Sequence, residues 1–342
     1  MVDYRFVVRF CNFLALILMI VIAYLFHIEK QTLFVSISLP KGLSRSQKPQ
    51  EEPVNNLTYP AFRHPLAPPY PYPYKFLINQ PDKCKHRRPF LILLVIGKIH
   101  DWEARQTIRE TWGNESNYDV DVLRIFLVGI TNFIQDRTQW MIEEESVAFG
   151  DIIQQDFMDT YYNLTLKTLM GMEWVTKFCN NASYVVKIDN DMFLNVECLI
   201  YKLLRPDLPL RVNYFTGHIV SSTGPFRSQA YKWYVPREVY PNDTYPPYCS
   251  GPGYVFSADL AKKIYNVSQR IRVIPMEDCF MGICLYELHI PLTPSPWGLF
   301  FGRYLKYDRC KFHKLITVHH YKNYRLRSIW PDFWNLKSTG CN

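Results

Sequence analysis

Continuous apolar runs alternate with segments in which apolar residues recur every three or four positions, between about residues 89 and 188. The run at 89–99 is typical of a strand buried on both faces of a sheet, and 122–130 is predicted to be a second buried strand. Shorter strands are predicted at 152–157 and 184–188. The intervening periodic segments predict helices at 101–113, 138–150 and 163–179. Strands that alternate with helices in this way predict an α/β fold built on a parallel sheet.

The N-terminal segment has no such alternation. Residues 10–26 form one apolar run, preceded by Arg5 and Arg9, and the run is long enough to cross a bilayer when those arginines reach the interface. A cleaved signal peptide is the alternative, but bulky residues stand where a cleavage site would need small ones. Because positive charge precedes the run and is cancelled after it, we expect a cytosolic tail at 1–9 and a transmembrane signal anchor at 10–28.

The following segment, 29–83, is rich in proline and poor in periodicity. Such a sequence cannot bury enough apolar surface to fold alone, and proline stiffens it into an extended spacer. The pattern therefore predicts a lumenal stem at 29–83 and a lumenal globular domain at 84–342.

Sequons and cysteines agree with a lumenal domain. N-x-S/T sequons, which predict N-glycosylation, occur at Asn56, Asn114, Asn163, Asn181, Asn242 and Asn266. Beyond the predicted anchor the chain has an even number of cysteines, which favours disulfides in an oxidising compartment: Cys84, Cys179, Cys198, Cys249, Cys279, Cys284, Cys310 and Cys341. Their pairing is left open by the sequence.

The distribution of charge does not suggest a nucleic-acid-binding arm. The formal net charge of +8 is spread along the chain without a Lys/Arg block, so we expect no nucleic-acid partner. This mild basicity is compatible with an anionic small molecule or a membrane surface.

The first candidate for chemistry is Asp189-Asn190-Asp191, which directly follows the strand predicted at 184–188. Ligands of α/β sheets bind at the carboxyl ends of strands, and two carboxylates there can share a divalent cation that also binds phosphate oxygens. Asp and Asn are also common in turns, where they bond to the backbone, and this alternative stays open for the motif taken alone.

Three further segments add to this candidate. Arg105 and Arg109 lie on one face of a predicted helix and could receive a phosphate or a uracil carbonyl, unless they form a solvated surface. The glycines of 248–257 allow a ligand to approach the backbone closely, or make a turn before a strand. Glu277-Asp278 interrupts an apolar passage and could supply a general base, or cap a helix.

Taken together, these segments resemble the β-1,3-galactosyltransferase family and, less closely, the β-1,3-N-acetylglucosaminyltransferases. The similarity runs from about residue 76 to the C-terminus. It rests on motifs in the family's order: ARQTIRETWG (104–113), FLVG (126–129), 151–175, KIDNDMFLN (187–195), NYFTG (213–217), 245–261 and EDCFMGICL (277–285). The resemblance implies a GT-A-like, Rossmann-type nucleotide-sugar-binding sheet with flanking helices, in a single-pass type II protein of the Golgi membrane.

The resemblance also implies roles for individual residues. Asp189 and Asp191 would bind Mn²⁺ and, through it, the diphosphate of a UDP-sugar, with His319 near the metal and His320 as the adjacent alternative. Asp278 would be the base that deprotonates the acceptor. Arg105, Arg109 and Asn190 are expected on the nucleotide-sugar side. The residues expected to contact the acceptor are Trp233, Tyr248, Gly251 and Glu277.

The expected activity is inverting transfer of galactose from UDP-galactose to the 3-hydroxyl of a terminal β-GlcNAc on a glycoprotein or glycolipid. One alternative is transfer of GlcNAc from UDP-GlcNAc to galactose. A second is a catalytically silent membrane glycoprotein that binds a cation or a glycan.

Two cysteines depart from the family pattern. Cys279 stands where relatives usually have an aliphatic residue, and Cys198 is likewise unusual. Both follow acidic motifs in the sequence, so we hypothesise that they form an additional disulfide near the active site.

Overall fold

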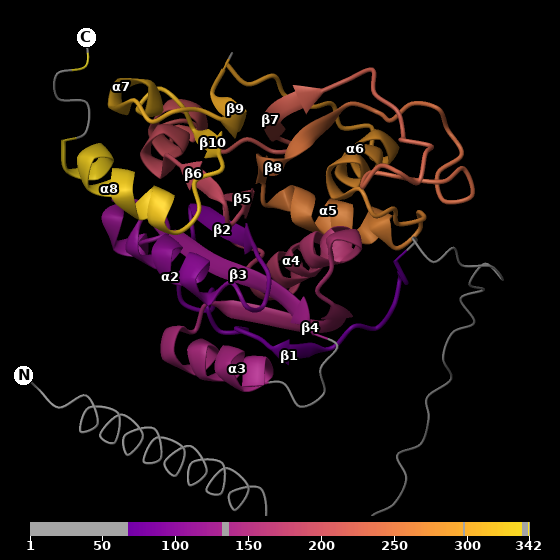
Figure 1. Ribbon diagram of the computed structural model, residues 1–342, viewed down its shortest axis with the longest axis horizontal. Coiled ribbons are helices and arrows are strands. Elements are labelled where there is room, and N and C mark those ends of the chain that lie inside the picture. Colours follow the sequence, from indigo (N-terminus) through magenta and orange to yellow (C-terminus); the bar gives the residue numbers. More distant parts are fainter. Residues whose placement is uncertain (1–67, 132–136, 297, 337–340, 342) are drawn as a thin grey trace, which may run out of the picture. The chain divides into compact units, whose positions relative to one another are not determined.

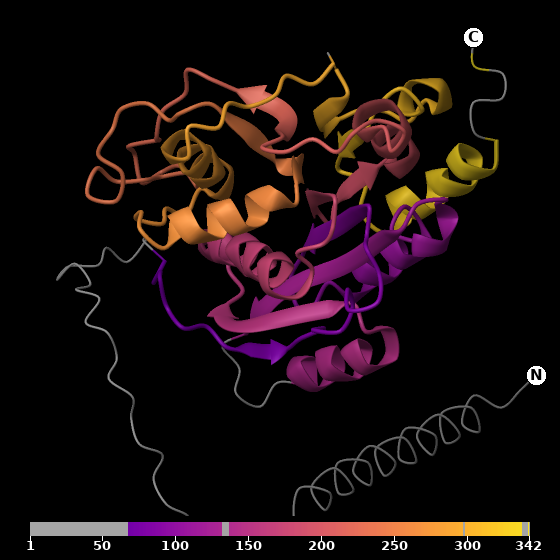
Figure 2. The ribbon, with the colours of Figure 1, turned by 180° about the vertical axis from the view of Figure 1, so that it is seen from behind.

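A seven-stranded mixed sheet with helices on both faces organises the chain (Figures 1 and 2). The computed structural model describes residues 68–131, 137–296, 298–336 and 341. The anchor predicted at 10–28 and most of the predicted stem lie outside these ranges. Within them, no helix combines the length and the apolar character that crossing a bilayer requires.

The centre of the sheet matches the predicted alternation. Its four parallel strands are β2 (Leu91–Ile96), β3 (Val122–Ile130), β4 (Ile152–Met158) and β5 (Tyr184–Asp189). The helices that connect them are α2 (Trp102–Glu110), α3 (Arg137–Phe149) and α4 (Leu164–Phe178). The predicted α/β class is therefore confirmed, with boundaries within about three residues of those expected.

The edges of the sheet are antiparallel, which the sequence did not predict. Three strands pair in this way, in the sheet order β1-β4-β3-β2-β5-β8-β7: β1 (Phe76–Ile78), β7 (Phe215–Val220) and β8 (Tyr248–Ser257). Because β1 belongs to the sheet, the globular domain begins before the boundary expected at Cys84.

Two hydrophobic cores cover the two faces. Alternate residues of β2 point to opposite sides, so Ile92 and Leu94 enter one core and Leu91 and Leu93 the other. The first core is closed by α4, α5 (Asp259–Ser268) and α6 (Glu277–Glu287). The second is closed by α2, by α8 (Tyr324–Leu336) and by a small sheet of β6 (Met192–Leu194), β10 (Thr317–His319) and β9 (Phe300–Tyr304). The result is three layers with the sheet in the middle (Figure 1).

Short helical segments complete the chain: η1 (Glu115–Asn117), η2 (Tyr161–Asn163), the π-helix η3 (Cys198–Leu204) and α7 (Arg309–Phe312).

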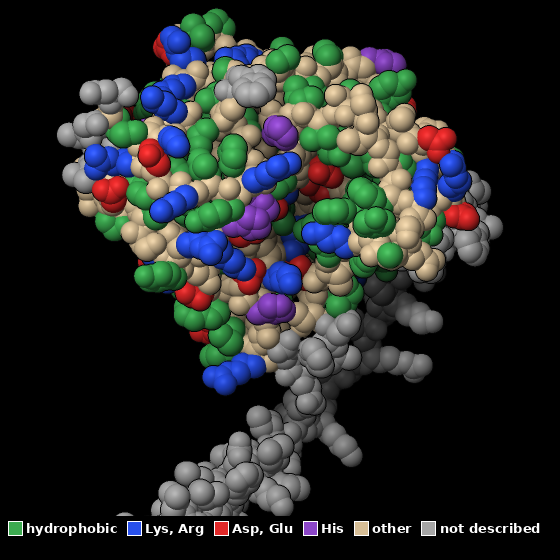
Figure 3. All heavy atoms as spheres, turned by 45° about the horizontal axis from the view of Figure 1, so that its top comes forward, with side chains coloured by type: hydrophobic (Ala, Val, Ile, Leu, Met, Phe, Trp, Pro, Cys, Tyr) green, Lys and Arg blue, Asp and Glu red, His purple; other side chains and the backbone are tan. Residues whose placement is uncertain are grey.

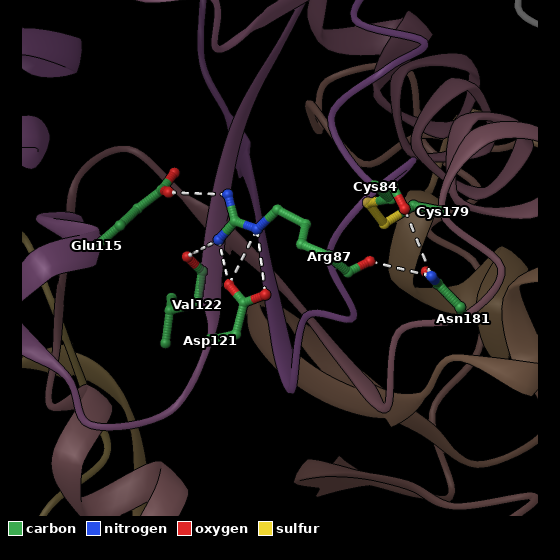
Figure 4. Close-up of a disulfide and its surroundings, with 7 residues drawn as sticks. All are labelled: Cys84, Arg87, Glu115, Asp121, Val122, Cys179 and Asn181. Atoms are coloured by element: carbon green, nitrogen blue, oxygen red, sulfur yellow. Dashed lines mark hydrogen bonds and ion pairs between the residues drawn. A yellow bond between two sulfur atoms is a disulfide. The ribbon is translucent and has the colours of Figure 1, made fainter.

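Disulfides fasten two peripheral segments. Cys84 and Cys179 join the segment before β2 to the end of α4 (Figure 4), and Cys310 and Cys341 join α7 to the C-terminus. The hypothesised Cys198–Cys279 disulfide is wrong, because both cysteines are free and buried in different cores on opposite faces of the sheet.

Candidate active site

The candidate site begins where the strand order reverses. The chain passes from β2 to β3 and β4 on one side and returns to β5 on the other side of β2. Asp189, the last residue of β5, lies opposite Ile96, the last residue of β2. The Asn190 backbone N–H then donates to the Ile96 carbonyl at 2.9 Å. Parallel sheets bind ligands in the crevice at such a reversal, so the aspartates lie where the fold predicts a site.

Two adjoining pockets open at this edge. The pocket that contains Asp101 and Asp191, here called the Asp101 pocket, has a volume of about 450 Å³. The pocket that contains Asp278, here called the Asp278 pocket, has a volume of about 570 Å³. Both are lined by Tyr161, Leu164 and Asp189, which form a common wall. Figure 3 shows a face hollowed near its centre, with acidic side chains inside and Lys, Arg and His side chains around it.

Asp191 faces two histidines: His319, the last residue of β10, and His320, which follows it. One carboxylate oxygen of Asp191 lies 3.2 Å from Nε2 of His319, and the rings of His319 and His320 stack at 3.9 Å. Ligand atoms of these three side chains all lie within 4.8 Å of one another. The sequence left His319 and His320 as alternatives, and the structure brings both to Asp191.

Asp191 and His319 each favour the charged form of the other. The hydrogen bond to Asp191 raises the pKa of His319 above its usual value, against an opposing effect of burial. Burial acts to raise the pKa of Asp191, but the hydrogen bond and charge of His319 outweigh it, and the net shift is downward. His319 Nδ1 faces the Gly302 carbonyl at 3.3 Å, so this nitrogen carries a proton and Nε2 is the one that faces the carboxylate.

This donor set fits a divalent metal. Two ligand atoms bound side by side at about 2.1 Å from a cation would be about 3 Å apart, close to the separation of Asp191 Oδ2 and His319 Nε2. A carboxylate combined with imidazole suits Mn²⁺ better than an all-oxygen set would. The carbonyl of Gly302 would orient the imidazole, as outer partners of metal-binding histidines do.

Asp189 is held by a different partner, Lys187. The Lys187 ammonium lies 2.7 Å from Asp189 Oδ1, 2.6 Å from the Gly251 carbonyl and 3.5 Å from Glu277 Oε2. Burial opposes the charge on Lys187, but the surrounding carboxylates raise its pKa. Asp189 therefore stands outside the Asp191–His319–His320 group, and Lys187 is a residue of the site that sequence reasoning missed.

Glu277 is buried rather than presented to a ligand. Burial raises its pKa, and the Tyr254 hydroxyl donates to one of its oxygens. Although Glu277 is among the residues around the Asp278 pocket, its hydrogen bond from Tyr254 ties it to β8 and its ion pair ties it to Lys187. Glu277 was expected to contact the acceptor, but its internal partners indicate that it instead supports its neighbour Asp278.

Asp278 occupies the first turn of α6 and faces its own pocket. The Gly251 backbone N–H donates to Asp278 Oδ2 at 3.1 Å, and the Cys279 N–H donates to Oδ1 at 2.9 Å. A Cβ on residue 251 would lie 3.3 Å from Asp278 Oδ2, so glycine permits this approach. The glycine-rich segment is itself part of β8, and Gly251 contacts the candidate base.

Asn190 and Asp101 both line the Asp101 pocket and bond to each other. The Asn190 amide donates to Asp101 at 2.8 Å, and Lys322 lies 3.0 Å from the same carboxylate. Lys98 and Lys322 line the pocket and bring positive charge to it. No signal in the sequence connected Asp101 or Lys322 with Asp191, because they come from segments far apart in the chain.

The structure contradicts the expected roles of Arg105 and Arg109. Arg105 binds Glu145 at 2.6 Å, and Arg109 binds Asp151 at 2.8 Å. Both arginines are buried, and neither belongs to the described lining of the two pockets. They are not solvated surface charges; they join α2 to α3 and to the residue before β4.

The remaining expected acceptor residues do gather at the Asp278 pocket. Tyr248 lines it and lies 3.3 Å from the Thr223 hydroxyl. Trp233 lines it from the segment between β7 and β8 and is 42% exposed.

The sequons differ in accessibility. Asn56 lies outside the described residues, whereas Asn181, Asn242 and Asn266 are exposed and Asn114 and Asn163 are half-buried. The Asn181 amide donates to the Arg87 carbonyl at 3.0 Å (Figure 4). Glycosylation of these residues stays a prediction.

Comparison with known proteins identifies relatives by sequence. A family model described as galactosyltransferase matches residues 103–296. Beta-1,3-galactosyltransferase 2 is 46% identical in Mus musculus and 47% in Homo sapiens, over 275 residues that cover 80% of this chain and 65% of each relative. Beta-1,3-galactosyltransferase 1 of Mus musculus is 41% identical over 313 residues, which cover 90% of this chain and 94% of that protein.

The match to the first two relatives thus spans less than two thirds of their length. Among solved structures, the apo form of the WbbM bifunctional glycosyltransferase matches with a TM-score of 0.37 and 13% identity, covering 68% of this chain and 46% of that chain. A score this low supports no inference about fold or activity. The family match and the extent of the sequence identity are sufficient by themselves: the chain belongs to the galactosyltransferase family.

Proposed function

We propose that this protein transfers galactose from UDP-galactose, with inversion, to the 3-hydroxyl of a terminal β-GlcNAc. The observation that carries the proposal is the common wall. The half-buried carboxylate Asp278 and the candidate metal ligand His319 line one pocket, Asp191 lines the other, and Asp189 lines both. Two pockets that adjoin in this way can hold a donor and an acceptor side by side, as one in-line displacement requires.

The donor is assigned to the Asp101 pocket because this pocket opens at the crevice where α/β sheets bind nucleotides. Lys98 and Lys322 in its lining could contact the diphosphate. Asp191, His319 and His320 would hold Mn²⁺ at the junction with the Asp278 pocket. When bound, the metal would neutralise charge that develops on the departing UDP.

The acceptor is assigned to the Asp278 pocket. Asp278 is the group to accept the proton of the attacking hydroxyl, because it is only half-buried and its neighbours Glu277 and Asp189 are both engaged by Lys187. The N–H groups of Gly251 and Cys279 fix its orientation. Galactose is preferred as the donor sugar because the relatives with 41–47% identity are named for that sugar.

The test is transfer by the purified full-length chain. With Mn²⁺, UDP-galactose and β-GlcNAc-methyl we expect a β-1,3-linked product, and chelation of the metal should abolish its formation. Transfer only from UDP-GlcNAc to a galactose acceptor would overturn the proposed donor. Absence of transfer from either donor would overturn the activity altogether.

The role of Asp278 makes a separate prediction. Asp278→Asn should lower kcat by about 10²–10⁴-fold, the usual contribution of a general base, while UDP and Mn²⁺ still raise the melting temperature. Asp207→Asn is the matched control, because Asp207 is an exposed carboxylate paired with Arg205. A kcat for Asp278→Asn within a few fold of wild type would assign the base elsewhere.

We also propose that the protein is a single-pass type II protein of the Golgi membrane, anchored by residues 10–28. The apolar run, the charges before it and the sequons after it support this topology. Microscopy of the tagged full-length chain, together with glycosidase sensitivity of its sequons, tests it. Cytosolic staining without N-glycans would contradict it.

A further inference from the structure

We propose that the Asp278 pocket continues into a second sugar-binding subsite, formed by Phe226 and Tyr231. This subsite would take the sugar that precedes the terminal residue of the acceptor. The inference rests on the proposed function and narrows its substrate class to oligosaccharides.

The subsite is a cluster of exposed aromatic rings at the pocket mouth. Phe226 is 44% exposed, Tyr231 is 52% exposed and Trp233 is 42% exposed. The Phe226 ring lies 5.0 Å from that of Tyr231 and 5.5 Å from that of Trp233. Single exposed apolar side chains are common on protein surfaces, but several in contact with one another beside a pocket mark a binding surface.

The cluster is anchored in place before any ligand arrives. Arg227 donates to the carbonyls of Val235, Tyr240 and Asn242, and the Val235 N–H donates to the Phe226 carbonyl at 2.9 Å. These bonds brace the segment between β7 and β8. A surface held in its binding conformation loses less entropy when it orders a flexible glycan.

A cation joins the cluster to the wall of the active site. The Lys232 ammonium lies 4.8 Å from the Trp233 ring and 5.5 Å from the Tyr161 ring. Such contacts hold an ammonium group over aromatic faces. Tyr161 belongs to the wall shared by both pockets, so the aromatic surface is continuous with the place where transfer would occur.

The positions of the three rings relative to the pocket indicate where a second sugar would bind. Trp233 and Phe226 line the pocket that contains Asp278, whereas Tyr231 contacts Phe226 and is absent from the described lining of that pocket. A terminal sugar seated at Asp278 would leave Tyr231 and the outer part of Phe226 for the next residue. The apolar faces of hexoses suit flat aromatic rings of this kind.

The experiment compares two acceptors with the full-length chain. One is β-GlcNAc-methyl, and the other is a trisaccharide with the same terminal β-GlcNAc followed by galactose and glucose. We expect the KM of the wild-type protein to be about five- to tenfold lower for the trisaccharide, the gain that one aromatic contact supplies. In Tyr231→Ala and Phe226→Ala the ratio of the two KM values should fall toward one. Tyr231→Phe should restore it.

Trp140→Ala is the control, because Trp140 is an exposed aromatic residue on α3 whose loss should leave the ratio unchanged. Equal KM values for both acceptors in the wild type, or an unchanged ratio in both alanine variants, overturn the subsite while leaving the proposed activity intact. If neither acceptor is galactosylated, the proposed function fails instead. Saturation-transfer NMR of the trisaccharide then decides the subsite: a signal from the galactose that Tyr231→Ala removes supports it, and no such signal overturns it.

Discussion

At the scale of single residues, Lys187 links the two halves of the site. Its ammonium contacts Asp189 on the wall between the pockets, Glu277 beside the candidate base and the carbonyl of Gly251, whose N–H holds Asp278. Several carboxylates close together repel one another unless a cation lies among them. Lys187 supplies that positive charge from within the protein.

Lys187→Met should therefore be severely destabilising. Removing one partner of a buried ion pair typically costs about 3–5 kcal/mol, and here Asp189 and Glu277 lose the same cation. Urea unfolding measures the loss. A second change, Glu277→Gln, should recover part of it by removing one uncompensated charge.

Lys177→Met is the matched control for this prediction, because the ammonium of Lys177 pairs with Glu173 while half exposed. Exposed pairs contribute about 0–1 kcal/mol. If both lysine variants lost the same small stability, Lys187 would not organise the carboxylates as described.

At the scale of elements, α2, α3 and β4 are joined by buried charges. Asp151 accepts hydrogen bonds from both Arg109 and Arg124, and Glu145 binds Arg105 and Arg109. Burial acts to raise the pKa of Asp151, but the hydrogen bond and charge of Arg109 and then those of Arg124 outweigh it and hold the pKa below its usual range. The helices are thus fastened to the sheet by a network that depends on pH.

The sign of this dependence follows from the lowered pKa. An unfolded Asp titrates near ~3.9, so the stabilisation by Asp151 is fully present above that value and is lost as the pH falls through it toward the folded value. We expect Asp151→Asn to reduce stability at pH 7 and to flatten the loss of stability between about pH 5 and pH 3. Thermal unfolding across this range measures both effects.

Asp207→Asn should change neither quantity appreciably, because Asp207 is exposed in its pair with Arg205. An acid profile of Asp151→Asn parallel to that of the wild type would show that other carboxylates control acid unfolding.

Periodicity identified the central strands and helices because burial on both faces leaves a mostly apolar run, continuous in β2 and interrupted once in β3. It identified Asp189, Asp191 and Asp278 because acids that interrupt apolar runs are visible locally. The ion-pair partners of Arg105 and Arg109 could not be predicted, because Glu145 and Asp151 come 40 and 42 residues later in the chain. Lys187 was missed for a different reason. A single lysine within an apolar strand gives no sign in the sequence that its side chain is buried among carboxylates.

At the scale of the whole molecule, the first described segment completes the sheet. Phe76 and Ile78 pair with β4, the Phe76 ring packs against Phe178 of α4, and the Tyr70 hydroxyl lies 3.1 Å from that of Ser268. A three-residue strand at this edge covers β4 while presenting little free edge of its own, which limits edge-to-edge aggregation.

A fragment that begins at residue 84 should therefore be less stable than one that begins at residue 68, both ending at residue 342. Without β1 the edge of β4 is open and contacts with α4 and α5 are lost. We expect the shorter fragment to melt at least about 4 °C lower, corresponding to one or two kcal/mol, and to scatter more light on heating. Identical melting and scattering would place residues 68–83 outside the folded unit.

The wall of Tyr161, Leu164 and Asp189 has a consequence for inhibitor design. A compound with a nucleotide-like head for the proposed donor pocket and an aminosugar for the proposed acceptor pocket needs only a short bridge across that wall. Once the head is seated, the tethered sugar is present at an effective concentration in the millimolar range. Two weak fragments joined in this way should bind far more tightly than either does alone.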